Sequence, residues 1–213
     1  MKTDRCKDLS VFYWGTIFSM KLSNIEFRAM QSFWRKWGHQ YFEMPLFKHL
    51  GLEVKGKDVL EIGCGNGFGG YLLNQLGPKS YVGLDVMEEQ VAIAQKKYPQ
   101  HQFLVQNATD LSRFTNASKD VVIIFGVLHH IPEWRKVIDE IARVLKPNGT
   151  LFLEEPRGVD IKLFDFFFRW GHPDSDFGLK AMEEHLKTLG FRFTKQWTPL
   201  LTMYRVQKVY LPK

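Results

Sequence analysis

From Lys57 onward, short apolar runs alternate with amphipathic stretches. Each run is four to seven residues long and is bounded by glycine, proline or polar residues, which predicts buried strands at residues 58–62, 80–85, 102–105, 120–126 and 150–155. The stretches between them carry apolar residues at helical spacing and predict helices at 67–76, 88–98 and 133–145. Strands separated by helices imply right-handed crossovers and a parallel sheet.

The last part of the chain has a different pattern. A helix is predicted over 179–189, with Gly190 as its stop, and strand-like runs follow at 191–197 and 202–209. The short connection around Pro199 favours an antiparallel hairpin. The expected fold class is α/β, a Rossmann-like three-layer sandwich with a mostly parallel seven-stranded sheet and a C-terminal antiparallel hairpin, over residues 44–213.

Residues 1–43 contain no strand signal and many aromatic residues. Between Asn24 and Glu43 the apolar positions are three and four residues apart, which predicts one face of a helix. That stripe consists of Phe27, Met30, Trp34, Trp37 and Tyr41. We expect residues 1–43 to form an N-terminal helical lid or cap segment.

Composition, net charge and cysteine content limit which kinds of protein this chain can be. The 213 residues are 45% hydrophobic and 24% charged, as in an ordinary globular protein, and the high aromatic content, 15%, indicates either a large aromatic core or an apolar pocket. The net charge is +6, but no run of five or six basic residues occurs, so nucleic acid is not an expected partner. Cys6 and Cys64 form neither a disulfide framework nor a metal motif, which favours a cytoplasmic protein without a structural metal.

The segment E-I-G-C-G-N-G, residues 61–67, connects the first predicted strand to a helix. Glycines let the backbone turn tightly and approach a ligand, so this loop predicts a nucleotide site. Asp85 ends the second predicted strand, 22 residues after Gly63, where a carboxylate can accept both hydroxyls of a ribose.

Register distinguishes two possible nucleotides. A dinucleotide fingerprint that starts at Gly63 would place its third glycine at Phe68, so an NAD site needs a slipped register. The register Glu61, Gly63, Gly65, Gly67 needs no slip, and its leading acid suits a ligand with a cationic amino-acid end. S-adenosylmethionine is therefore the favoured cofactor.

The segment D-V-L-E-I-G-C-G-N-G resembles motif I of class I S-adenosylmethionine-dependent methyltransferases, most closely methyltransferase type 11. Segments resembling the family's later motifs follow in order at residues 84–87, 106–111, 120–130 and 143–149, and the resemblance covers roughly residues 45–209. Asn107 replaces the family's usual Asp, but its carbonyl can still accept from the adenine amino group. The resemblance implies cofactor contacts by Glu61, Gly63, Cys64, Gly65, Gly67, Asp85, Val86, Met87, Asn107, Ala108, Phe125 and Gly126.

Methyl transfer from a sulfonium is an in-line displacement that mainly needs alignment and exclusion of water. Acid–base candidates lie after the fourth and fifth predicted strands, where α/β proteins bind ligands. They are His129, His130 and Glu155, with an orienting, core or salt-bridging role as the alternative for each. A metal site of Glu155, His172 and Asp174 has irregular spacing and is not expected.

The acceptor is the least determined part. Candidate substrate-binding residues are Tyr13, Trp14, Trp34, Tyr41, Glu154 and His172. The N-terminal aromatics can line an acceptor pocket, lie with Arg28, Arg35 and Lys36 on an anionic membrane, or simply pack on the domain. We expect a methyltransferase for a small aromatic or lipid-like acceptor, as a monomer or homodimer; the alternatives are an RNA or protein acceptor, or cofactor binding without catalysis.

Overall fold

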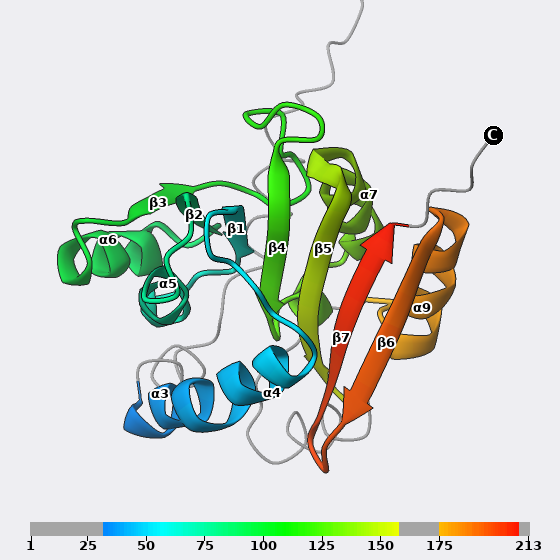
Figure 1. Ribbon diagram of the computed structural model, residues 1–213, viewed down its shortest axis with the longest axis horizontal. Coiled ribbons are helices and arrows are strands. Elements are labelled where there is room, and N and C mark those ends of the chain that lie inside the picture. Colours follow the sequence, from blue (N-terminus) through cyan, green and yellow to red (C-terminus); the bar gives the residue numbers. More distant parts are fainter. Residues whose placement is uncertain (1–31, 158–174, 209–213) are drawn as a thin grey trace, which may run out of the picture.

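The computed structural model describes residues 32–157 and 175–208, and a seven-stranded sheet forms the centre of the described part (Figure 1). The strand order is β3-β2-β1-β4-β5-β7-β6, and of these seven strands β7 alone runs opposite to the other six. The strands are β1 (Asp58–Ile62), β2 (Ser80–Asp85), β3 (Gln102–Val105), β4 (Lys119–Phe125), β5 (Leu145–Pro156), β6 (Phe191–Trp197) and β7 (Leu201–Lys208). The predicted α/β sandwich with its C-terminal hairpin is confirmed.

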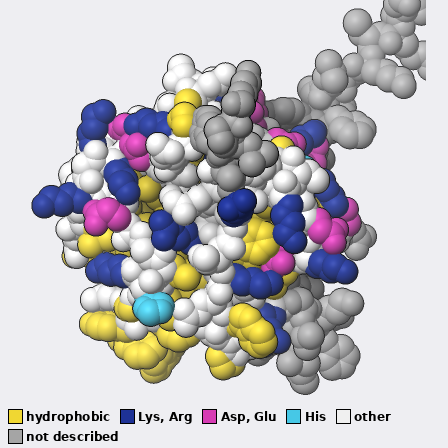
Figure 2. Space-filling model, turned by 45° about the vertical axis from the view of Figure 1, so that its right-hand side comes forward, with side chains coloured by type: hydrophobic (Ala, Val, Ile, Leu, Met, Phe, Trp, Pro, Cys, Tyr) yellow, Lys and Arg dark blue, Asp and Glu magenta, His cyan; other side chains and the backbone are white. Residues whose placement is uncertain are grey.

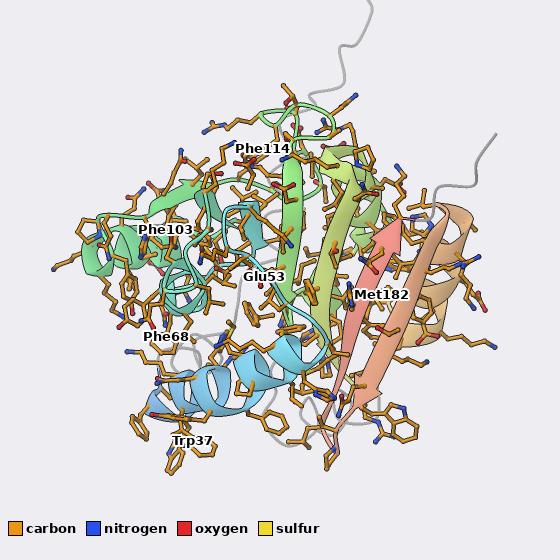
Figure 3. The ribbon with its side chains drawn as sticks, viewed as in Figure 1. Trp37, Glu53, Phe68, Phe103, Phe114 and Met182 are labelled. Carbon is orange, nitrogen blue, oxygen red and sulfur yellow. The ribbon has the colours of Figure 1, made fainter. Side chains whose placement is uncertain are left out.

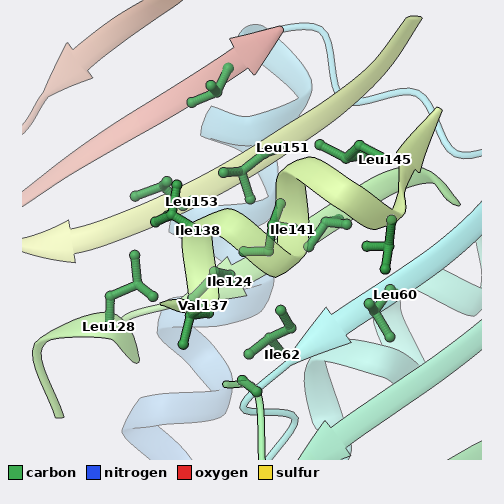
Figure 4. Packing of buried hydrophobic residues seen from close by; sticks show 14 of the residues in the cluster. Leu60, Ile62, Ile124, Leu128, Val137, Ile138, Ile141, Leu145, Leu151 and Leu153 are labelled. Carbon is green, nitrogen blue, oxygen red and sulfur yellow. The ribbon is translucent and has the colours of Figure 1, made fainter. Parts of the chain in front are cut away.

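Alternate residues of the central strands supply the two faces of the sheet. Leu60, Ile62 and Ile124 belong to one buried cluster, where they pack with α7 (Trp134–Val144) (Figure 4). The same cluster includes residues of α9 (Leu179–Thr188). The intervening residues Val59 and Ile123 belong to the other cluster, with α5 (Phe68–Asn74) and α6 (Glu88–Lys97). Both faces are therefore apolar, which explains the unbroken hydrophobic runs in the sequence.

The described N-terminal segment is one nearly continuous helical rod. It comprises α3 (Phe33–Gly38), a π-helical turn η1 (His39–Glu43) and α4 (Met44–His49). The Ser32 side chain caps α3 by accepting from the Arg35 N–H. Phe47 of α4 is fully buried against Phe125 and Phe152, and this contact holds the rod at the carboxyl ends of β4 and β5.

The largest difference from the predicted boundaries is the start of the fifth strand. The sequence predicts a strand from residue 150, but β5 begins at Leu145, directly after α7 and before the turn Pro147–Gly149. The register to β4 shifts across this turn, from Lys119 opposite Leu145 to Val121 opposite Thr150. The three turn residues therefore form an irregularity inside the strand rather than a separate loop.

Candidate functional site

The glycine loop follows β1 at the point where the sheet reverses its winding, between β1 and β4. Gly63, Gly65 and Gly67 all have positive φ, at 73°, 50° and 82°. The N–H groups of Gly63 and Cys64 both donate to the Leu84 carbonyl, at 2.7 and 2.8 Å. The loop is thus fixed to the end of β2 in a backbone conformation that favours glycine.

Two of these glycines differ in what surrounds them. A Cβ at Gly63 would lie 2.3 Å from Val127 Cγ2, whereas a Cβ at Gly65 would meet nothing within 4 Å. We expect Gly63→Ala to cost about 3 kcal/mol of stability, from left-handed strain plus overpacking, and Gly65→Ala only about 1–2 kcal/mol, from strain. Urea denaturation measures both, and equal losses would contradict the assignment of Val127 as the obstacle.

Asp85 connects the loop to the next helix. Its Oδ2 accepts the Gly65 N–H at 2.9 Å and its Oδ1 accepts the Met87 N–H at 2.8 Å. Burial raises the pKa of Asp85, an effect that these N–H donors oppose. The carboxylate therefore lies beside the glycine loop and also positions its backbone.

Glu61, the acid that leads the glycine motif, is buried at 1% exposure and accepts a hydrogen bond from the Tyr81 hydroxyl. Burial raises the pKa of Glu61 to about 8, although the bond from Tyr81 opposes this shift. Glu61 also lines a pocket together with Gly63, Cys64 and Gly65. A buried acid of raised pKa at a pocket wall is typical of a binding site.

The raised pKa of Glu61 predicts how stability depends on pH. An acid whose pKa is higher in the folded state binds its proton more tightly there, so its contribution to stability is full below pH 4.5 and is lost as the pH rises toward 8. We expect Glu61→Gln to make the fall in unfolding free energy between pH 5 and 8 shallower, measured by urea denaturation. Glu53→Gln, at an exposed position, is the control. If the unfolding free energy fell equally steeply with pH in the wild type and in Glu61→Gln, the pH dependence would not come from Glu61.

The pocket is an open depression, and the space of about 360 Å³ that it borders includes open solvent. One wall is the glycine loop, and the opposite wall is α3 and η1, which contribute Arg35, Lys36 and His39. The remaining lining residues are Asn66, Phe68, Gly69 and Phe125. Figure 3 shows Phe68 in front of α5, directed toward α3. The wall of the pocket that faces the glycine loop is therefore formed by α3 and η1.

A buried charge network joins this helix to the sheet. Arg35 pairs with Glu43 and lies 3.7 Å from Glu154, at the end of β5. His39 Nε2 lies 3.4 Å from Glu43 Oε2, and the His39 ring packs on Phe125 with centroids 4.6 Å apart. Burial raises the pKa of both Glu43 and Glu154 and lowers that of His39. Arg35 is thus placed between two buried carboxylates beside the pocket.

Glu155 organises the loop after β4. Its Oε1 accepts the N–H groups of Val127 and Leu128, at 3.2 and 2.8 Å, and its Oε2 lies 2.7 Å from His129 Nδ1. Burial raises the pKa of Glu155 to about 8, and the backbone donors oppose the shift. Glu155 therefore fixes the orientation of His129, whose ring lies 4.0 Å from the His130 ring between centroids.

The other expected cofactor residues border the same sheet edge. Val86 and Met87 follow Asp85 at the start of α6, and Gly126, with φ 64°, follows Phe125 at the end of β4. Asn107 and Ala108 follow β3, and Asn107 Oδ1 accepts the Thr109 N–H at 3.0 Å. The Cys64 side chain is buried in the core cluster of α5 and α6.

The candidate substrate residues are distributed differently from expectation. Trp34 and Tyr41 are 75% and 61% exposed and do not line the described pocket, so their position does not match the expected acceptor lining. Glu154 lies 3.7 Å from Arg35, and Arg35 lines the pocket. Tyr13, Trp14 and His172 lie outside the described residues, and with them most of the expected lid segment 1–43.

Sequence reasoning missed the inward face of α3 and η1. Arg35, His39 and Glu43 are spaced four residues apart and lie on one helical face, opposite the aromatic stripe. That spacing was visible in the sequence. It was overlooked because the sequence analysis considered only where the apolar stripe would face: an acceptor pocket, a membrane or the domain.

Comparison with known proteins adds independent information. A family model described as a methyltransferase domain matches residues 60–153. A "probable S-adenosylmethionine-dependent methyltransferase" of Mycolicibacterium smegmatis is 31% identical over 152 residues, which are 68% of this chain and 56% of that protein. The phthiotriol/phenolphthiotriol dimycocerosates methyltransferase of Mycobacterium leprae is 38% identical over 103 residues, 47% of this chain and 38% of that protein. The chain thus spans about half, or less, of these curated relatives.

Solved structures agree on the fold. A methyltransferase from Aquifex aeolicus, described as dependent on S-adenosylmethionine, superposes with a TM-score of 0.70 at 17% identity, over 89% of this chain and all of that one. Another from Mesorhizobium loti has a TM-score of 0.68 at 14% identity, over 78% and 97%. Together with the glycine loop and its flanking acids, the family match shows that residues 60–153 form a methyltransferase domain similar to those of S-adenosylmethionine-dependent methyltransferases.

Proposed function

We propose that this protein transfers the methyl group of S-adenosylmethionine to a small acceptor, aromatic or lipid-like, bound at the carboxyl ends of β4 and β5. The observation that carries the proposal is the pocket formed by the glycine loop and α3–η1, with acidic and basic side chains on opposite walls. Two carboxylates, Glu61 and Asp85, and two cationic side chains, Arg35 and Lys36, lie in or next to this pocket. A ligand that joins a zwitterionic amino acid to a ribose requires both kinds of charge.

The residues present fit this cofactor. Glu61 suits the ammonium group, and the side chains of Arg35 and Lys36 suit the carboxylate group. Asp85, which uses one lone pair on each oxygen for backbone donors, retains acceptor capacity for ribose hydroxyls. Residues after β3, Asn107 and Ala108, are the expected adenine contacts. When bound, the cofactor supplies an electrophilic methyl group on a sulfonium.

The protein itself would align the acceptor and exclude water. His129 is the stronger general-base candidate of the two histidines because Glu155 fixes its ring orientation at 2.7 Å. Glu155 accordingly acts as a positioning residue rather than as a base. Acceptors that are already nucleophilic would need no base, since alignment alone supplies much of the rate.

The acceptor class is inferred from a relative and from the lining of the pocket. The relative from Mycobacterium leprae is named for phthiotriol and phenolphthiotriol dimycocerosates, which are lipids. Two aromatic side chains, Phe68 and Phe125, line the pocket, which also favours an apolar acceptor over RNA. A protein or RNA acceptor, or cofactor binding without turnover, is the alternative that the experiment below distinguishes.

Binding of the demethylated product tests the proposal first. S-adenosylhomocysteine at 100 times its dissociation constant should add about 2.7 kcal/mol of stability, seen as a rise in the melting temperature. Transfer of a labelled methyl group to a panel of lipids, phenols, RNA and protein would then identify the acceptor class. No stabilisation by either cofactor form would overturn the proposed function.

A further inference from the structure

The helix over the pocket is oriented with its charged side inward. Arg35, His39 and Glu43 face the sheet, whereas the large aromatic side chains of the same eleven residues, 33–43, are exposed. We call these exposed residues the aromatic face; they are Phe33, Trp34, Trp37, Tyr41 and Phe42. Figure 3 shows Trp37 directed away from the sheet. Apolar residues gathered on one exposed helical face indicate a binding surface.

The aromatic face is ordered by contacts within itself. The rings of Phe33 and Trp34 meet edge to face, with centroids 5.6 Å apart, and those of Trp37 and Tyr41 lie 5.8 Å apart. These ring contacts lie along the outside of the helix rather than in the core. Four of the five exposed aromatic residues are therefore paired and not isolated on the surface.

The exposed charge of this helical rod is basic. Between residues 32 and 50 the acidic residue is Glu43, which is buried at 4% exposure, whereas the basic Lys48 is exposed; Lys36, also basic, lines the pocket. Figure 2 shows hydrophobic side chains along the lower rim of the molecule with Lys and Arg side chains above them. Aromatic side chains bordered by basic ones match the interface of a bilayer that contains anionic lipid.

A second apolar tip lies at the same end of the molecule. Trp197 and Leu200, 67% and 57% exposed, flank the β6–β7 turn, and the Arg157 guanidinium lies 5.5 Å from the centroid of the Trp197 ring. Leu201 pairs with Pro156 at the end of β5, so this turn borders the carboxyl edge of the sheet. Figure 1 shows α3 and the turn at the same lower end. Two separate elements thus repeat the same combination of exposed tryptophan and nearby cation.

We propose that the aromatic face, with the Trp197 turn as a second contact, docks this protein on the surface of an anionic lipid bilayer. Tryptophan and tyrosine favour the headgroup region because one part of the ring is apolar and another is polar, and the basic side chains add attraction to anionic lipid. Because α3 also forms a wall of the pocket, docking brings that wall to the membrane surface. Docking on the bilayer does not depend on methyl transfer. Only the idea that the pocket takes a lipid-like acceptor from the membrane rests on the proposed function.

Vesicle co-sedimentation of the full chain tests the proposal. The wild type should bind vesicles of phosphatidylglycerol and phosphatidylcholine, and raising the salt concentration from 0.1 to 0.5 M should weaken binding because the ionic part is screened. Trp34→Ser/Trp37→Ser should reduce vesicle affinity by about tenfold or more, given the apolar area each tryptophan buries. Trp197→Ser should reduce it to a smaller extent.

Matched controls separate docking from folding and from cofactor binding. Val105→Ser removes an exposed apolar side chain from the opposite edge of the sheet, in β3, and should leave vesicle binding unchanged. All variants should keep the melting temperature and the stabilisation by S-adenosylhomocysteine, since none of the three tryptophans lines the pocket. Loss of that stabilisation in every form, wild type included, would count against the proposed function and not against docking.

Three results would overturn the docking proposal. One is failure of the wild type to bind anionic vesicles. Another is vesicle binding by Trp34→Ser/Trp37→Ser that equals the wild type. The last is a wild-type dimer in sedimentation equilibrium that this double variant abolishes while vesicles bind neither form, which would assign the aromatic face to a second copy of the chain.

Discussion

Replacing Glu155 by alanine should destabilise the protein by about 3–5 kcal/mol, which lowers the melting temperature by roughly 10 °C or more. Glu155 is fully buried and accepts two backbone N–H groups of the loop after β4, while its other oxygen pairs with His129. Alanine would leave these buried groups without their acceptor, and such groups are costly when unpaired. Urea denaturation with circular dichroism measures the loss.

Two further variants isolate the cause. Glu155→Gln retains an acceptor oxygen for the loop amides and should lose only about 1 kcal/mol. Glu184→Ala, at an exposed position on α9, should change stability by no more than about 0.5 kcal/mol. If Glu155→Ala were as stable as Glu184→Ala, the loop would not depend on this carboxylate, and the assignment of Glu155 as the residue that positions His129 would fail.

Asp85→Asn should weaken binding of S-adenosylhomocysteine by about 100-fold, measured by calorimetry. Hydrogen bonds to a charged acceptor contribute roughly 1.5–3 kcal/mol each, and the change removes the charge from the acceptor of Gly65 and from the expected ribose contact. The amide also places a donor next to one of two backbone donors. The cost therefore combines lost contacts with a disturbed glycine loop.

Asp110→Asn is a close control. Asp110 Oδ1 accepts the N–H of Ser112, two residues later, as Asp85 accepts that of Met87, but no bond links it to the glycine loop. Its change should leave product affinity within about twofold, since it removes only a local turn contact. Equal affinities for Asp85→Asn and wild type would remove Asp85 from the cofactor site.

The glycine loop was predictable because its chemistry depends on local sequence. Closely spaced glycines directly after a strand predict a tight turn that other residues cannot form. In the structure Gly63, Gly65 and Gly67 have positive φ, which explains why these positions are glycine. The same holds for Asp85, whose position at the end of a strand follows from the alternation of runs. Strand boundaries for β1, β2, β3 and β6 were predicted to the residue for this reason.

The orientation of α3 and η1 was not predictable in this way. Helical spacing identified the aromatic stripe, but spacing is the same whether a stripe faces the core or the solvent. The contacts of Arg35 with Glu154 and of His39 with Phe125 set the orientation of the helix. These contacts can form only when β4 and β5 lie beneath the helix. Those partners are more than 80 residues away in the chain, so no local pattern contains the information.

The sequence by itself determined the fold class, the glycine loop and its two flanking acids, because periodicity and glycine spacing are properties of neighbouring residues. The tertiary structure decided the rest of the site: the pairing of Glu155 with His129, the position of Arg35 between two buried carboxylates, and the outward direction of Trp34. These contacts join separate strands and helices, and long-range packing alone brings their side chains together.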